Sequence, residues 1–177
     1  KLALKASELR ARGNIGVAYT YNEPLTGYEY VRDAAKIVKQ YGMKNVLVTN
    51  GAFSEAVEES LLPYIDAMNV DLKGIREDYY RKLGGDLGTV QNFIKKAADR
   101  CHVELAALIV PGENDSREEM EEMAAWVASV NPDIPLHVNR FFPRWNMADK
   151  KATETEKVYR LAETARAYLK YVFVGNC

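Results

Sequence analysis

Residues 46–71 read VLVTNGAFSEAVEESLLPYIDAMNVD, and this stretch decides the fold class. A β-branched run at 46–49 is followed by a segment at 54–65 with apolar residues at helical spacing, and then by a second short apolar run at 67–71. This order predicts a strand, a helix and a second strand, which together form a βαβ unit of a parallel sheet.

The same alternation runs along the rest of the chain. Further strands are predicted at 15–21, 103–110, 136–141 and 171–174. Further helices are predicted at 27–41, 77–83, 87–100, 116–130 and 153–169. The βα steps are short, about 30 residues each, and fit a barrel or an open barrel better than a doubly wound sheet, although spacing alone does not separate the two. No linker or low-complexity stretch interrupts the pattern, so residues 1–177 are predicted to form a single α/β domain.

The composition argues against several classes of protein. With 24 Lys and Arg against 25 Asp and Glu, the net charge is −1, so neither a nucleic-acid partner nor a membrane surface is expected. No apolar run approaches the roughly 20 residues that span a bilayer, and no signal peptide is recognisable. The cysteines, Cys101 and Cys177, are too far apart for a local metal motif and indicate a reducing compartment, so we expect a cytoplasmic protein.

Ligands of parallel α/β folds bind at the carboxyl ends of the strands, where this sequence places several polar residues. Tyr21, Asn22, Glu23 and Pro24 follow the first predicted strand. Because Pro24 disfavours helix at Glu23, the carboxylate and the neighbouring amide are predicted to face a ligand rather than to cap a helix. An ordinary solvated turn is the alternative.

The later strands add polar residues of other kinds. Thr49 and Asn50 can bond to a hydroxylated ligand, or can simply form a turn. Asp71 and Lys73 lie on one face of their strand. Burial of two such charged groups is costly unless they pair or bind a ligand, so they indicate a binding site. A structural ion pair is the alternative. His137 lies on the fifth predicted strand. A single histidine on a strand more often makes its hydrogen bonds within the fold than takes part in catalysis.

The helix predicted at 116–130 has a clear start. Asn114, Asp115 and Ser116 offer caps, and Glu119 follows Ser116 at the spacing of a capping box.

Six motifs in order, YTYNEP, VTNG, NVDLK, LIVPGENDS, PLHVNRFFP and YVFVGN, make the chain resemble the radical S-adenosylmethionine (SAM) family. The resemblance is closest to its pyruvate formate-lyase activating enzyme-like branch, in particular the radical SAM enzymes of the AmmeMemoRadiSam system. It implies a TIM-type (β/α)6 partial barrel and a [4Fe-4S] cluster held by the cysteines of a CxxxCxxC loop. Such enzymes reductively cleave SAM to a 5′-deoxyadenosyl radical, which abstracts hydrogen from a substrate.

The resemblance also assigns residues to SAM. They are Tyr21, Asn22, Glu23, Thr49, Asn50, Asp71, Lys73 and His137. The first three stand where the family has a GGEP motif near the methionine amino group, with two glycines replaced. The threonine and asparagine match a segment beside the methionine and ribose, the Asp and Lys match a DxK pair near the methionine carboxylate, and the histidine matches one near the ribose and adenine. No catalytic residue and no metal ligand are assigned.

The CxxxCxxC motif is absent from this chain. We therefore expect a radical SAM core without its first strand and cluster loop. The implied partners are SAM, a protein or peptide substrate and an electron donor such as flavodoxin or ferredoxin. Two other readings stay open: an aldolase or lyase that uses Lys73 as a Schiff base, and a non-catalytic domain that binds SAM or a peptide.

The chain on its own is expected not to cleave SAM, because two distant cysteines cannot supply the thiolates that a cluster requires. Anaerobic reconstitution with iron and sulfide, followed by chromatography for 5′-deoxyadenosine, tests this expectation. Formation of 5′-deoxyadenosine above a protein-free sample would contradict it.

Overall fold

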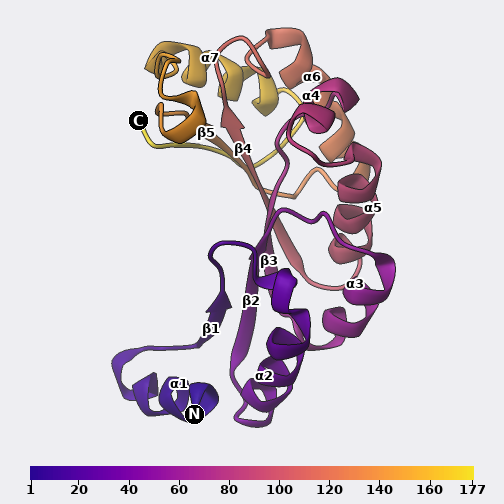
Figure 1. Ribbon diagram of the computed structural model, residues 1–177, viewed down its shortest axis with the longest axis vertical. Coiled ribbons are helices and arrows are strands. Elements are labelled where there is room, and N and C mark those ends of the chain that lie inside the picture. The colour runs from indigo at the N-terminus through magenta and orange to yellow at the C-terminus, as the bar shows by residue number, and fades with distance from the viewer. The chain divides into compact units, whose positions relative to one another are not determined.

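The structure, a computed structural model, describes residues 1–177 as two compact units. The first unit contains residues 1–70 and 89–103, and the second contains residues 71–88 and 104–177. In each unit, parallel strands are covered by helices (Figure 1).

The first unit is built on three parallel strands that pair in chain order. They are β1 (Gly16–Tyr19), β2 (Lys44–Thr49) and β3 (Ala67–Asp71), whose last residue, Asp71, belongs to the second unit. The α-helices are α1 (Leu2–Glu8), α2 (Tyr28–Gln40), α3 (Glu55–Leu61) and most of α5 (Leu87–Ala98). Short 3-10 helices are η1 (Leu9–Arg12), η2 (Pro24–Gly27) and η3 (Leu62–Tyr64). Since the strands are parallel, their carboxyl ends lie at one edge of the sheet, where β1 and β2 present their polar residues.

The second unit repeats this plan. Its strands are β4 (His102–Ile109), which begins in the first unit, β5 (Leu136–Arg140) and β6 (Val172–Gly175). β5 pairs in parallel with both neighbours, so Leu136 lies beside Leu105 on one side and Val172 on the other. The helices are α4 (Glu77–Lys82), α6 (Arg117–Val130), α7 (Thr155–Arg166) and the 3-10 helix η4 (Trp145–Met147).

A buried amide joins three elements of the first unit. Asn45 on β2 is fully buried, and its oxygen accepts a hydrogen bond from the Tyr19 hydroxyl at 3.1 Å. Its amide nitrogen donates to the backbone oxygens of Ala35 on α2 and Tyr64 on η3. Every polar atom of this side chain is therefore paired, which a buried amide requires.

The predicted order of strands and helices is confirmed, several boundaries differ by a few residues, and three of these differences have a clear physical reason. The first strand ends at Tyr19 instead of residue 21, because Tyr21 adopts a left-handed φ of 31° that leaves the strand. The helix predicted at 54–65 ends at Leu61 and continues as 3-10 helix, since Pro63 has no N–H to donate. The last helix begins at Thr155, after Thr153 has bonded to β4 and to the end of β5.

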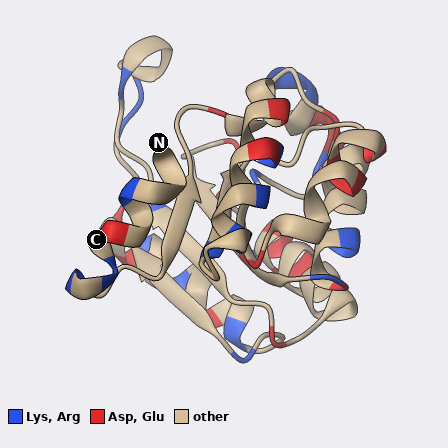
Figure 2. Cartoon of the chain, turned by 90° about the horizontal axis from the view of Figure 1, so that it is seen from below, with Lys and Arg blue, Asp and Glu red and all other residues tan.

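Charge and capping also follow the sequence. The Ser116 hydroxyl accepts from the Glu119 N–H at 3.1 Å, so the predicted N-cap of α6 is confirmed. Basic and acidic residues are interspersed on the helices (Figure 2), in keeping with the net charge of −1. None of the helices is both long and apolar enough to cross a bilayer.

One carboxylate in the first unit is buried at an energetic cost. Glu58 on α3 is 3% exposed, and its Oε1 atom has no hydrogen-bond partner. The nearby ammonium of Lys96 on α5 pairs instead with Glu55 and Glu59. Burial raises the pKa of Glu58 from 4.5 to about 7.

Replacement of Glu58 by glutamine is expected to stabilise the fold at high pH. Between pH 4.5 and 7 the folded state keeps a proton that the unfolded state has lost, so wild-type stability falls as the pH rises through this window. Above pH 7 Glu58→Gln should exceed wild type by on the order of 1 to 3 kcal/mol, and below pH 4.5 it should gain little. Urea unfolding at pH 4.5 and 8 measures the difference, with Glu59→Gln as the exposed control; equal gains at both pH values would contradict the assignment.

Candidate functional site

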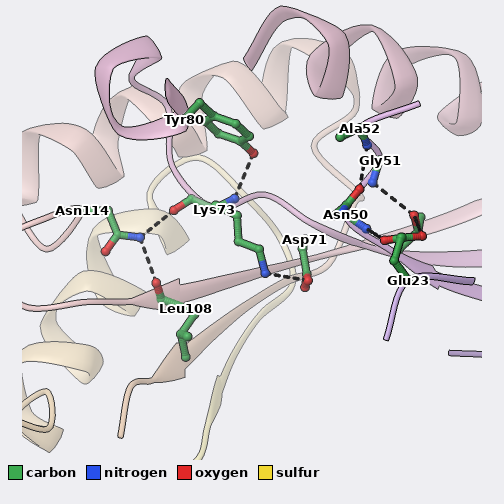
Figure 3. Close-up of polar contacts among 10 residues, drawn as sticks. Glu23, Asn50, Gly51, Ala52, Asp71, Lys73, Tyr80, Leu108 and Asn114 are labelled. Atoms are coloured by element: carbon green, nitrogen blue, oxygen red, sulfur yellow. Dashed lines mark hydrogen bonds and ion pairs between the residues drawn. The ribbon is translucent and has the colours of Figure 1, made fainter. Parts of the chain in front are cut away.

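Glu23 organises the carboxyl ends of β1 and β2 in the first unit. Its backbone is extended, with φ −138° and ψ 103°, as the following proline requires. One carboxylate oxygen accepts from the Thr49 hydroxyl at 2.7 Å and from the Leu25 N–H at 3.2 Å. The other accepts from the Asn50 N–H at 2.8 Å, a contact shown in Figure 3.

The prediction that Glu23 faces a ligand rather than caps a helix is wrong in part. Glu23 is the N-cap of η2, because its side chain reaches the Leu25 N–H that the short helix leaves unpaired. A carboxylate has about four lone-pair sites, and three are occupied by Thr49, Leu25 and Asn50. Glu23 thus holds the loop in place and keeps room for one further donor.

Thr49 and Asn50 have different roles. Thr49 is buried, and its hydroxyl donates to Glu23 while it accepts from the Gly51 N–H at 3.2 Å, so it supports the carboxylate. The Asn50 side-chain oxygen accepts from the Ala52 N–H at 2.9 Å (Figure 3), which leaves its NH₂ group to donate to a ligand. A glycine is needed directly after them, at Gly51: its φ is 68°, and a Cβ there would lie 3.1 Å from Val70.

Tyr21 and Asn22 lie beside a cavity. Both are exposed, and with Glu23 they line a hollow of about 700 Å³ in the first unit that also borders Tyr30 and Val31 of α2. This volume is within the usual range of small-molecule sites, about 300 to 1,000 Å³. The structure therefore groups Glu23, Tyr21 and Asn22 around one hollow.

Asp71 and Lys73 form an ion pair at the end of β3. The Lys73 Nζ atom lies 2.7 Å from Asp71 Oδ2, and each side chain is 36% exposed. The ion pair that was the structural alternative is thus present, but it is accessible. One contact leaves the second carboxylate oxygen and two ammonium hydrogens for a ligand.

The backbone of Lys73 is held by two residues that sequence reasoning missed as site residues. Its N–H donates to the Tyr80 hydroxyl, and its carbonyl accepts from the Asn114 amide. Asn114 was predicted as a candidate helix cap; it is 1% exposed and binds backbone groups instead, while Ser116 caps α6. An asparagine between a strand and a helix cap is a weak signal for this role, since such side chains often bond nearby backbone.

His137 lies early in β5. It is the second residue of this strand, and its Nε2 is 2.7 Å from Glu104 Oε2. Its ring stacks on Phe173 of β6 with centroids 5.3 Å apart. These contacts suit a histidine that is satisfied within the fold, and they leave its Nδ1 atom for a further partner.

The cysteines do not fit an iron–sulfur cluster. Cys101 is half-buried, its thiol donates to the Ala97 carbonyl, and burial raises its pKa to about 11. Cys177, the last residue of the described chain, is exposed. No group of three or more His, Cys, Asp or Glu side chains is placed to hold a metal within residues 1–177. A cluster needs several thiolates together, so these residues do not provide its site.

Comparison with known proteins identifies the superfamily of this chain. The family model described as "Radical SAM superfamily" matches residues 1–127, and the chain belongs to this superfamily. Its members generally use SAM and a [4Fe-4S] cluster.

Two activating enzymes are similar to this chain. The chain is 23% identical over 172 residues to the pyruvate formate-lyase-activating enzyme of Clostridium pasteurianum, covering 90% of this chain and 72% of that protein. A domain of the pyruvate-formate lyase-activating enzyme of Bacteroides vulgatus has the same fold, with a TM-score of 0.76, 17% identity and coverage of 91% of this chain and 99% of that one. The predicted α/β partial-barrel fold is confirmed, and the similarity to these activating enzymes agrees with the branch that the sequence motifs resemble.

A third relative shows the extent of the match. An uncharacterised protein of Methanocaldococcus jannaschii is 36% identical over 165 residues, which cover 91% of this chain and 49% of that protein. The chain therefore spans about half the length of this relative.

Loss of the Glu23 carboxylate should unfold the loop that it holds. Glu23→Ala removes the acceptor of two backbone N–H groups and one hydroxyl, so it should cost about 2 kcal/mol of unfolding free energy. Glu23→Gln, which keeps one acceptor oxygen, should cost less. Asn22→Ala, at the exposed neighbour, should stay within about 0.5 kcal/mol of wild type in the same urea titration. A loss at Glu23 no larger than that of the control would rule out this structural role.

Proposed function

We propose that this chain is the SAM-binding core of a radical SAM enzyme of the activating-enzyme type. In the intact protein such an enzyme would convert SAM at a [4Fe-4S] cluster to a 5′-deoxyadenosyl radical for hydrogen abstraction. The observation that supports this most is the accessible Asp71–Lys73 pair at the end of β3.

Each unit keeps polar groups of the kind that the methionine end of SAM needs, and their assignment to one ligand rests on the family resemblance. Its carboxylate needs a cation, for which Lys73 keeps ammonium hydrogens beside Asp71. Its ammonium needs an acceptor, for which Glu23 keeps one lone-pair site. Tyr21 and Asn22 border the same hollow as Glu23 and are proposed to line this end of the ligand.

The nucleoside end needs neutral donors and acceptors. The Asn50 NH₂ group is proposed to donate to a ribose hydroxyl. His137 is proposed to contact the ribose or adenine through Nδ1, since Nε2 is held by Glu104. Thr49 contributes indirectly, because its hydroxyl already binds the Glu23 carboxylate.

The remaining components are proposed from the family alone. The thiolates of the cluster would come from outside residues 1–177, so this chain alone would be inactive. We place the protein with the AmmeMemoRadiSam-type members, in the cytoplasm, with a protein or peptide substrate and a flavodoxin or ferredoxin as electron donor. The alternative of a non-catalytic domain that only binds SAM or a peptide differs from this proposal in one expectation: the intact protein would show no turnover.

The Schiff-base reading has less support. A lysine is activated as a nucleophile by a desolvated pocket or a neighbouring cation. Lys73 is instead 36% exposed and faces the Asp71 carboxylate at 2.7 Å.

Titration calorimetry with SAM tests the proposal on this chain. Wild type should bind, and Lys73→Met and Asp71→Asn should each weaken binding by about tenfold, because each removes one charged contact. Lys95→Met, which removes an exposed lysine of α5, should leave the affinity within about twofold.

Two results would contradict the proposal. Wild type without measurable SAM binding would remove it, as would equal effects of Lys73→Met and Lys95→Met. Borohydride trapping with pyruvate should give no adduct on Lys73, and an adduct there by mass spectrometry would favour the aldolase or lyase reading.

A further inference from the structure

The peptide groups on both sides of the Lys73 Cα are fixed by side chains. The Lys73 N–H donates to the Tyr80 hydroxyl at 3.0 Å, and the Lys73 carbonyl accepts from Asn114 Nδ2 at 2.7 Å, as Figure 3 shows. Tyr80 is 3% exposed and Asn114 is 1% exposed. Water therefore has little access to either holding group, and hydrogen bonds shielded from water are more rigid than exposed ones.

Asn114 is itself rigidly held. Its Nδ2 also donates to the Leu108 carbonyl at 2.8 Å, and its Oδ1 accepts from the Val110 N–H at 2.7 Å. All three partners of this side chain are backbone groups, two of them at the end of β4. The Asn114 amide therefore links the Lys73 carbonyl to the end of β4, the next strand in the sequence.

Side chains of α4 and α6 pack closely against the backbone that follows Lys73. A Cβ on Gly74 would come within 2.8 Å of the Tyr79 ring and 3.2 Å of the Glu119 carboxylate. The same carboxylate hydrogen-bonds to the backbone of Ile75. The backbone from Lys73 to Ile75 is thus packed between α4 and the start of α6.

We propose that Tyr80 and Asn114 are positioning residues that orient the Lys73 ammonium for its ligand by fixing the Lys73 backbone. A lysine side chain is long and flexible, so an ammonium on a mobile backbone would lose more freedom on binding a carboxylate. The proposal rests on the proposed function in taking that ligand to be SAM. Neither residue reaches the ligand in this role; each acts through Lys73.

The first test removes one hydroxyl. Tyr80→Phe deletes the acceptor of the Lys73 N–H and keeps the ring, and Tyr79→Phe deletes the hydroxyl of the adjacent buried tyrosine as a matched control. In protein labelled with ¹⁵N and ¹³C lysine, the Lys73 Nζ signal, assigned with Lys73→Arg, should move toward that of free lysine in Tyr80→Phe only. SAM affinity should fall by about fivefold to tenfold in Tyr80→Phe and by less than about twofold in Tyr79→Phe.

The second test removes two donors. Asn114→Asp keeps the size and the acceptor for Val110 but loses both N–H donors, whereas Asn131→Asp makes the same change at an exposed position. Asn114→Asp should shift the Lys73 signal and lower SAM affinity at least as much as Tyr80→Phe. Thermal unfolding checks that each variant is folded, and if Asn114→Asp is not, Tyr80→Phe decides the question.

The outcomes separate the two proposals. If wild type binds SAM but Tyr80→Phe matches Tyr79→Phe in both the Lys73 signal and affinity, the positioning role is wrong and the SAM site stands. If wild type does not bind SAM but the Lys73 signal moves in Tyr80→Phe only, the SAM site is wrong and the positioning of Lys73 stands.

Discussion

A backbone group that leaves a parallel strand loses its sheet partner and must find another, and this constraint shapes both units. After β2, the Asn50 N–H finds the Glu23 carboxylate. After β3, the Lys73 N–H and carbonyl find Tyr80 and Asn114. The side chains that bond these backbone groups also fix where the neighbouring polar side chains point. The same hydrogen bonds therefore satisfy the strand ends and position the residues of the candidate site.

Most of the fold could be predicted, because hydrophobic periodicity records which face of each element is buried. The strand at 67–71 was placed at its observed limits, and α2 shows why helices were found: Val31, Ala35 and Val38 recur at helical spacing and are all buried. Boundaries were missed where one residue overrides the pattern, as with the left-handed Tyr21 and the Thr153 hydroxyl. Such effects depend on tertiary partners that no short window of sequence contains.

The site was predicted only as a set of residue types. Asp71 and Lys73 could be paired in advance, since a period of two places them on one face of a strand. The engagement of Glu23 with Thr49 could not, because the two are separated by 26 residues and meet only when β1 and β2 align. Tyr80 and Asn114 were missed for a related reason: their bonds go to backbone, which leaves no complementary side chain in the sequence to suggest a partner.

The Asn114 contacts have a consequence for how this site can evolve. All of its bonds go to main-chain atoms of residues 73, 108 and 110, so they constrain path and not side-chain identity. The side chain at position 73 can therefore be substituted while the Asn114 amide still donates its hydrogen bond to the carbonyl of residue 73. In such an arrangement the residue that contacts the ligand, Lys73, is distinct from the residues that position it, Tyr80 and Asn114. Ligand preference can therefore change by single substitutions at position 73 while the conformation of the loop is kept.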